Sequence, residues 1–364
     1  MGITSFSSAL LCLFVFCGLV VAQKDRDVEL ATRFAPVFYQ ALGDKPRSDY
    51  ITNFDFDGDW QGDNNWNHAG SKEFPLKAYI YYSVSETSTH YFIHYGVFHP
   101  RDYKGGEKKG AILSELIREG AKRGGQYDPT GLADETALAH ENDMEGALVV
   151  VQKHGSEVKD GRVVFVESLH HNQFGRYQPG DESSMIRLED QHALLYVEPK
   201  GHGIEAFKGD KKQVNKKTFL RYAVGTRATD PGKEDYVCND LENGSCDKSV
   251  SYELIPLATL WSKANSEANQ TYGVTNDYNE VKLSLNINGS TSDKAFKIGT
   301  VGCAFLGSVG GINMARPPWG WFDRDEKTVP LGQWFFDPAT AVKRDFKLDA
   351  EFSTTYVRLP FWAK

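Results

Sequence analysis

The sequence predicts an all-β fold (a β-rich α+β chain): an antiparallel β-sandwich with a few inserted helices. The 364 residues include 22 Phe, 17 Tyr and 7 Trp, which favour strands, and 34 Gly, which favour tight turns. Short runs alternate apolar with polar residues, the pattern of a half-buried strand. Asp-Gly and Asn-Gly turn signals, as at 57–58 and 243–244, separate these runs.

The elements follow this pattern along the chain. Strand-like runs lie at residues 76–86, 89–98, 146–154, 162–171, 192–199, 280–288 and 354–362. The segment 106–125 differs, because Ile112, Leu113, Leu116 and Ile117 recur at helical spacing with charges on the other face. We therefore expect one surface helix inserted between strands.

The first residues carry a targeting signal. Residues 9–22 form an uncharged apolar run that ends in Val20-Val21-Ala22, the small residues that signal peptidase prefers, before polar Gln23. We expect 1–22 to be a secretory signal peptide, 23–364 a single large domain, and the protein secreted and extracellular. An uncleaved anchor is the alternative, since the n-region lacks Lys and Arg.

Charge and hydropathy exclude other classes. The chain has 41 Lys and Arg against 49 Asp and Glu, a net charge of −8, which argues against sequence-independent nucleic-acid binding. A mean hydropathy of −0.46 excludes a polytopic membrane protein.

The cysteines and sequons fit an oxidising compartment. Cys238 and Cys246 flank a turn-rich loop and are able to close a short disulfide, whereas Cys303 lies in an apolar run typical of a buried free thiol. N-glycosylation sequons occur at Asn243, Asn269 and Asn288, and matter only in a eukaryotic host.

The densest chemical cluster is residues 140–145, with the sequence HENDME, just before an apolar strand. On an extended strand Asp143 and Glu145 point to the same face, and His140 joins them only if the chain turns at 141–142. Two carboxylates and an imidazole there suit a hard divalent cation, Mg, Ca or Mn. The spacing equally fits a solvated acidic turn that enters a strand.

This cluster resembles a known family. An aromatic strand ending in Pro100-Arg101-Asp102, followed by the HENDME cluster, is similar to the Pro-Lys-Asp strand and Gly-His-Arg-His-Asp-Trp-Glu signature of necrosis-inducing (necrosis- and ethylene-inducing-like) proteins. The resemblance implies a secreted β-sandwich that binds a divalent metal and plant sphingolipid head groups. It places the metal ligands at Asp102, His140, Asp143 and Glu145. Asn142 and Met144 replace the family's second His and its Trp, which puts the toxin activity in doubt.

Other motifs resemble the related vacuolar protein sorting-associated protein 62-like family. The matching segments are short and scattered: 34–36 (FAP), 95–100, 143–145, 195–203 (LYVEPKGHG), 316–321 and 333–338. They extend the resemblance from about residue 34 to residue 338.

Two further features are candidates for the same cleft. His202 lies between two glycines that allow close backbone approach, so it is a candidate fifth ligand or general acid–base group. His170 and His171 end a strand and are weaker candidates. The aromatic residues of 319–336 either pack into the core or form a contact surface for sugars or lipids.

Three functions remain open from the sequence. The first is a secreted metal-binding protein, necrosis-inducing-protein-like, that recognises glycan or lipid head groups and makes peripheral membrane contact. The second is a metal-dependent hydrolase of phosphoester or glycosidic bonds in which His202 or Glu141 moves the proton. The third is an extracellular structural or matrix protein. The oligomeric state is not determined by the sequence.

Overall fold

The computed structural model describes residues 25–102, 140–263, 275–302 and 317–361, apart from 44, 63, 156, 172, 216, 240, 242–245, 288–289, 324, 327 and 331; for 140 and 275–302 it describes the backbone alone. The predicted signal peptide, the helix expected at 106–125, Cys303 and the three sequons lie outside the described residues. Within the described part, no helix is long and apolar enough to cross a membrane.

Strands dominate the described residues, and each predicted strand range overlaps one. The strands are β1 (Val37–Leu42), β2 (Tyr79–Thr87), β3 (His90–Asp102), β4 (His140–Gln152), β5 (Arg162–His170), β6 (Gln173–Tyr177), β7 (Leu188–Glu189), β8 (His192–Val197), β9 (Ile204–Ala206), β10 (Thr218–Val224), β11 (Cys238–Asn239), β12 (Val250–Pro256), β13 (Thr275–Ile287), β14 (Ser290–Gly302) and β15 (Tyr356–Arg358). Alternating apolar residues and turn dipeptides therefore located these strands, whereas the strands β1, β6, β7, β9, β10, β11, β12 and β14 were not predicted.

The helices are short and lie outside the sheet. They are η1 (Pro46–Asp49), α2 (Asn65–Gly70), η2 (Val158–Asp160), α5 (Lys211–Val214), α6 (Ala258–Trp261), η3 (Pro318–Gly320), α8 (Gln333–Phe336) and α9 (Pro338–Asp345), together with a helical segment at 25–33. The expectation of a strand-rich chain with few helices is confirmed.

The sheet is mixed, so the prediction of an antiparallel sheet is wrong. Hydrogen bonding links the strands in the order β13-β14-β4-β3-β2-β12-β10-β1-β8-β7, within one 15-stranded network. β2, β3, β4, β5 and β6 pair antiparallel, but β1–β8, β10–β12 and β12–β2 pair parallel. Parallel neighbours need long crossovers, which local turn signals do not reveal. Because the described strands form one network, a sandwich of two separate sheets is not confirmed.

The central strands separate two hydrophobic clusters. Along β3, Ile93 and Tyr95 belong to one cluster, which we call the inner core, whereas Phe92 and Phe98 belong to the other, the outer core. This alternation follows from the two-residue period of a strand. β3 is buried almost throughout because both of its faces are covered.

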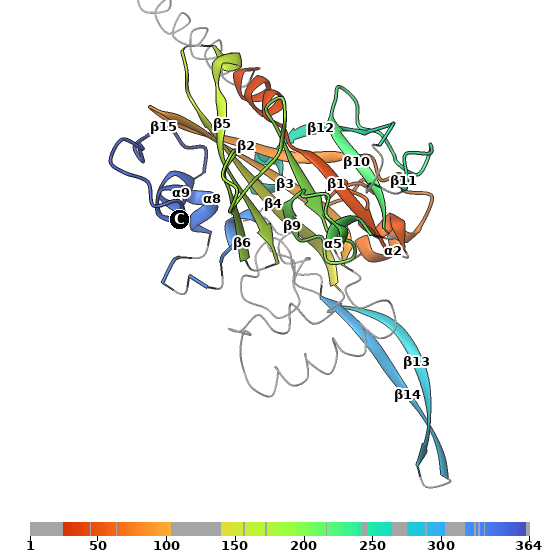
Figure 1. Ribbon diagram of the computed structural model, residues 1–364. Helices are drawn as coiled ribbons and strands as arrows, with labels where there is room; N and C mark the ends of the chain where they lie inside the picture. The colour runs from red at the N-terminus through yellow and green to blue at the C-terminus, as the bar shows by residue number, and fades with distance from the viewer. Residues whose placement is uncertain are drawn as a thin grey trace, which may run out of the picture.

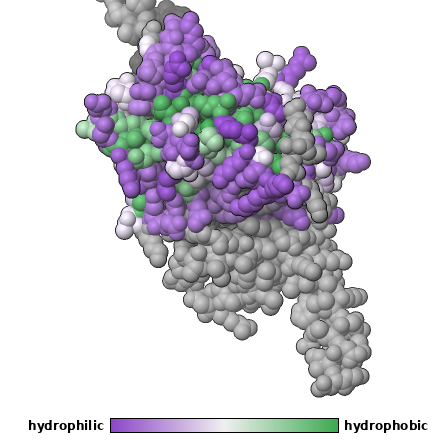
Figure 2. Space-filling model, in the orientation of Figure 1, coloured by the Kyte–Doolittle hydropathy of each residue, from purple (hydrophilic) through white to green (hydrophobic). Residues whose placement is uncertain are grey.

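Different parts of the chain cover the two faces. The inner core continues into the helical segment at 25–33 and into β1, β8, β10 and β12, whereas the outer core is closed by the C-terminal segment with α8 and α9. In Figure 1, α8 and α9 lie beside the sheet, and the β13–β14 hairpin extends away from it. Figure 2 shows a largely hydrophilic face with a hydrophobic area across its upper middle.

A disulfide joins Cys238 and Cys246, as the sequence predicted. Cys238 lies in β11, which pairs with the first two residues of β10, and it is buried in a small third hydrophobic cluster with Phe219. The disulfide therefore ties a surface loop to the sheet.

Candidate functional site

The predicted carboxylates lie where the inner face of β3 and β4 becomes polar. In β4, Ala147 and Val149 belong to the inner core, and the same two-residue period extends this face to Glu145 and Asp143, before the left-handed Asn142 interrupts it ahead of Glu141. On β3, His99 is the cross-strand partner of Asp143, and Arg101 is that of Glu141. The apolar parts of β3 and β4 thus hold these polar residues in place at one end of the inner core.

His202 joins two carboxylates at this end. Its Nδ1 lies 2.8 Å from Asp143 Oδ2, and its Nε2 lies 3.3 Å from Asp49 Oδ1. Burial lowers the pKa of His202, but the hydrogen bonds to Asp143 and Asp49 outweigh it and raise the pKa to about 10. At neutral pH the ring is an imidazolium that shares its charge between two buried acids.

The backbone around His202 and Asp49 explains this arrangement. His202 has a φ of 54°, in the left-handed region, and follows Lys200, which has a φ of 72°. Asp49 ends η1, and its carboxylate accepts hydrogen bonds from the backbone N–H of Gly43 at 2.7 Å and of Lys200 at 2.7 Å. The tight β8–β9 loop is therefore attached to Asp49 at two points, the Lys200 backbone N–H and the His202 ring.

His99 lies flat against His202. The two rings are 3.7 Å apart with an interplanar angle of 7°. Burial and the neighbouring His202 charge hold the pKa of His99 well below its usual range, so this ring is neutral. Its Nε2 lies 2.9 Å from Gln40 Oε1, an acceptor because the Gln40 amide nitrogen donates to Ala41 O. His99 Nδ1 is then a buried lone pair without a hydrogen-bond partner among the described residues.

The strand end is held by α2. The Trp66 backbone N–H donates to Glu141 Oε1, and Arg101 donates to the Trp66 carbonyl. Asn142 has a φ of 58°, so the turn required at 141–142 is present, and asparagine tolerates this conformation. Its side chain accepts from Asn65 at 2.6 Å and donates to the Gly62 carbonyl at 2.8 Å.

The structure brings the predicted metal ligands onto two adjacent strand ends. Asp102 and His140 are cross-strand partners, and Asp102, Asp143 and Glu145 are 4%, 6% and 5% exposed. The side chain of His140 lies outside the described residues, so the four-ligand set stays a prediction. The donors fit a hard cation, because carboxylate oxygens with one imidazole favour Mg, Ca or Mn.

The predicted catalytic residues are both fully buried. Both ring nitrogens of His202 face carboxylates, and Glu141 holds the α2 backbone. Their contacts are those of positioning groups, and a catalytic role stays a prediction for each of them.

Sequence reasoning missed Asp49, His99 and Gln40. His99 lies in the aromatic strand, and its position directly before the Pro-Arg-Asp segment was an available signal. Asp49 and Gln40 lie in segments without any motif. Gln40 reaches the site through the pairing of β1 with β8, and Asp49 through the helix η1 that follows β1.

The tryptophan segment packs into the core, which is one of its two expected arrangements. Trp321 is 0% and Trp334 is 2% exposed, and the Trp321 ring N–H donates to the Met144 carbonyl at 3.1 Å. Trp319 and Phe336 at the edge of this group are only partly buried.

Comparison with known proteins gives distant structural matches. No family model matches the chain, and no curated protein matches it. The structure of NLPPya in complex with glucosamine is 16% identical over 49% of this chain and 67% of that one, with a TM-score of 0.29. Necrosis and Ethylene inducing Protein 2 from the causal agent of cocoa's witches' broom disease is 15% identical over 49% and 67%, with a TM-score of 0.28.

A third structure, "Toxin fold for microbial attack and plant defense", is 12% identical over 66% of this chain and 81% of its own, with a TM-score of 0.30. Parts of this chain are therefore similar to structures from the family that the HENDME cluster resembles. TM-scores at this level mean that the chains do not superpose as wholes.

Proposed function

We propose that this chain is a secreted, divalent-cation-dependent protein that recognises the polar head groups of glycans or lipids at a cell surface. Asp102, His140, Asp143 and Glu145 would hold the cation, Mg, Ca or Mn. The bound cation would supply a Lewis-acid contact for hydroxyl or phosphate oxygens.

The observation that carries this proposal is the amount of buried negative charge at one strand end. The acids there are all 6% exposed or less: Asp49, Asp102, Glu141, Asp143 and Glu145. Among the described residues, His202 lies between Asp143 and Asp49, and Arg101 is the cross-strand neighbour of Glu141. Buried carboxylates are costly unless cations offset them, and a divalent ion offsets two charges at once.

The chain's own residues would orient the ligands. His202 fixes Asp143, and Asp49 fixes His202 from the far side. Such outer contacts restrict the direction in which a ligating carboxylate presents its oxygens. The same contacts favour a binding role over hydrolysis, because the two residues expected to move a proton are already engaged in holding the site together.

Metal binding tests the proposal directly. The purified protein, stripped with chelator and dialysed against Mg, Ca or Mn, should retain about one ion per chain by elemental analysis. Asp143→Ala should abolish retention, whereas Asp235→Ala, which removes an exposed carboxylate, should not change it. A concentration of metal 100 times its Kd should stabilise the fold by about 2.7 kcal/mol in thermal unfolding.

Ligand binding completes the test. Glucosamine and mannosamine, which occur in two of the similar structures, are suitable first probes, followed by vesicles with glycosylated sphingolipids. Binding should require the metal and disappear in Asp143→Ala, without any turnover. Metal-free protein that remains folded and binds these probes as well as the loaded protein does would contradict the proposal. Metal-dependent turnover of a phosphoester or glycoside would favour the hydrolase, and metal retention without any binding would favour the structural protein.

A further inference from the structure

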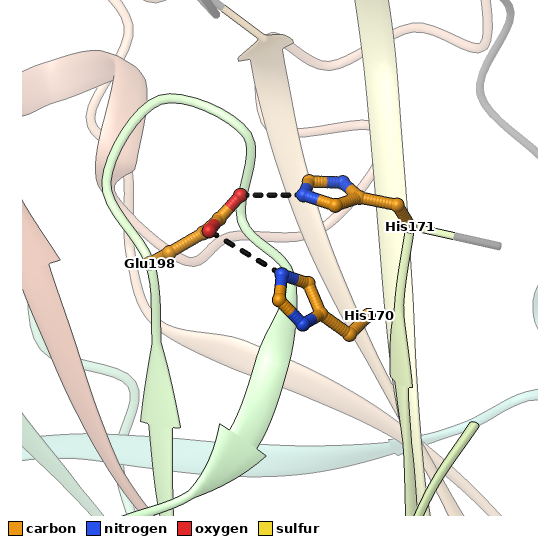
Figure 3. A group of neighbouring side chains, drawn as sticks. All are labelled: His170, His171 and Glu198. Atoms are coloured by element: carbon orange, nitrogen blue, oxygen red, sulfur yellow. Dashed lines mark ion pairs between the residues drawn. The ribbon is translucent and has the colours of Figure 1, made fainter. Parts of the chain in front are cut away.

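A second group of metal-ligating side chains lies outside the Asp143 site. His170 ends β5, His171 follows it, and Glu198 follows β8. His170 Nε2 lies 3.4 Å from Glu198 Oε2, and His171 Nε2 lies 2.7 Å from Glu198 Oε1. Figure 3 shows both imidazoles pointing at the one carboxylate.

An irregular backbone brings these rings together. Consecutive residues of a strand point to opposite faces, so two adjacent histidines do not ordinarily share a partner. His171 has a φ of 57°, and this left-handed turn directs its ring to the same side as that of His170. Gly203 makes room for the His170 ring, since a Cβ there would lie 2.1 Å from His170 Cδ2.

We propose that His170, His171 and Glu198 bind one Zn²⁺ or a similar divalent transition-metal ion. Two imidazoles and one carboxylate are the protein ligands of one class of zinc site, in which water takes the fourth position. One ligand atom from each residue lies within 4.8 Å of the others. In a tetrahedral site with metal–ligand distances of about 2.0–2.1 Å, ligand atoms are roughly 3.3 Å apart. The His170–Glu198 distance of 3.4 Å matches this spacing, the His171–Glu198 pair at 2.7 Å would have to open, and the ligand atoms of the two histidines lie within 4.8 Å of each other.

Glu205 supplies the outer contact that such sites use. His170 Nδ1 lies 3.0 Å from Glu205 Oε1, so Glu205 holds the Nδ1–H and leaves Nε2 to face Glu198. Histidine ligands of metals commonly donate their other ring N–H to a carboxylate, which fixes the tautomer and raises ligand basicity. Glu205 is therefore a positioning residue for His170.

This group differs from the Asp143 site in its metal-ligating atoms and in its exposure to water. Its side chains are accessible to water, at 28% for His170, 16% for His171 and 26% for Glu198. Two imidazoles suit zinc, copper or nickel, whereas the buried acids of the first site suit harder ions. The β8–β9 loop connects both groups, since Glu198 begins it and His202 lies within it.

Calorimetric titration of the purified protein with Zn²⁺ tests the proposal, in excess Ca²⁺ so that the first site is saturated. The wild type should bind one Zn²⁺, and replacing it by Co²⁺ should give the visible bands of a four-coordinate ion. His171→Ala and Glu198→Gln should weaken binding by at least about 100-fold, and Glu205→Ala by about 10–100-fold.

Two control variants show whether this group, rather than another part of the protein, holds the Zn²⁺. His154→Ala removes an exposed imidazole elsewhere, and Asp235→Ala removes an exposed carboxylate elsewhere; both should retain Zn²⁺ at wild-type affinity. Circular dichroism confirms that each variant is folded. A folded wild type that binds no Zn²⁺ would show that the histidines only form ion pairs with glutamate. Unchanged affinity in both His171→Ala and Glu198→Gln would also overturn the proposal.

Discussion

His202 shows how one residue stabilises several distant segments. Its imidazolium lies between Asp143 of β4 and Asp49 of η1, and neutral His99 of β3 stacks on it. The sequence alone indicated that Asp143 and Glu145 lie on the same face of a strand, because the two-residue period of a strand is a local property. It did not indicate Asp49 or Gln40, because their approach depends on long-range pairing.

The first prediction concerns His202. In chelator, His202→Ala should lower the free energy of unfolding by about 3–5 kcal/mol, because it leaves Asp143 and Asp49 buried without their shared charge. Urea unfolding measures this loss. His154→Ala, which removes an exposed ring, should change stability by less than about 0.5 kcal/mol. A His202→Ala protein within about 1 kcal/mol of wild type, on the order of one hydrogen bond, would mean that the bridge contributes little.

At the scale of elements, a buried glutamate links β5 to the C-terminal helices. Glu167 is 0% exposed and accepts a hydrogen bond from the Trp334 ring N–H at 2.7 Å. Arg176 lies near Glu167, Asp323 and Asp345. Burial and the nearby Asp345 hold the pKa of Glu167 well above its usual range. The acid is therefore favoured in its protonated form in the fold.

This shift predicts a pH dependence. A carboxyl group whose pKa is raised by folding contributes stability below its unfolded pKa, about 4.3, and loses it as pH rises through the folded pKa. Glu167→Gln stays neutral at every pH, so it should stabilise the fold by about 1–2 kcal/mol at pH 7, with a gain that shrinks below about pH 4.3. Thermal unfolding across a range of pH measures the gain in stability and its dependence on pH. Glu157→Gln, which changes an exposed glutamate, is the control. A gain that does not vary with pH would refute this assignment.

The positions of strands along the chain were easier to predict than the pairing between strands, and the reasons are physical. The strand at 89–98 and its neighbours were predictable because side-chain alternation and turn dipeptides are local. The parallel pairs β1–β8 and β10–β12 were not, because each depends on a long connection with no local signature. The Cys238–Cys246 disulfide was predictable because a short turn-rich loop brings its ends together.

At the scale of the whole molecule, the C-terminal segment completes the outer core. Trp321 packs so closely on β4 that a Cβ at Gly146 would lie 2.3 Å from its ring. Phe335 and Val342 are 1% and 0% exposed and belong to the same cluster as Phe92 of β3. The C-terminal segment therefore covers strands of the sheet that are far from it in sequence.

Removing residues 317–364 should therefore prevent folding of the remaining chain. Each large side chain lost from the outer core forfeits roughly 1.5–3 kcal/mol of burial, and several of them together exceed the roughly 5–15 kcal/mol by which a typical protein is stable. The truncated protein should aggregate or show no cooperative thermal transition, and co-expression of 317–364 as a separate chain should restore one. A truncated chain that unfolds cooperatively near the wild-type temperature would show that the inner core suffices, and that the C-terminal segment only covers an already stable sheet.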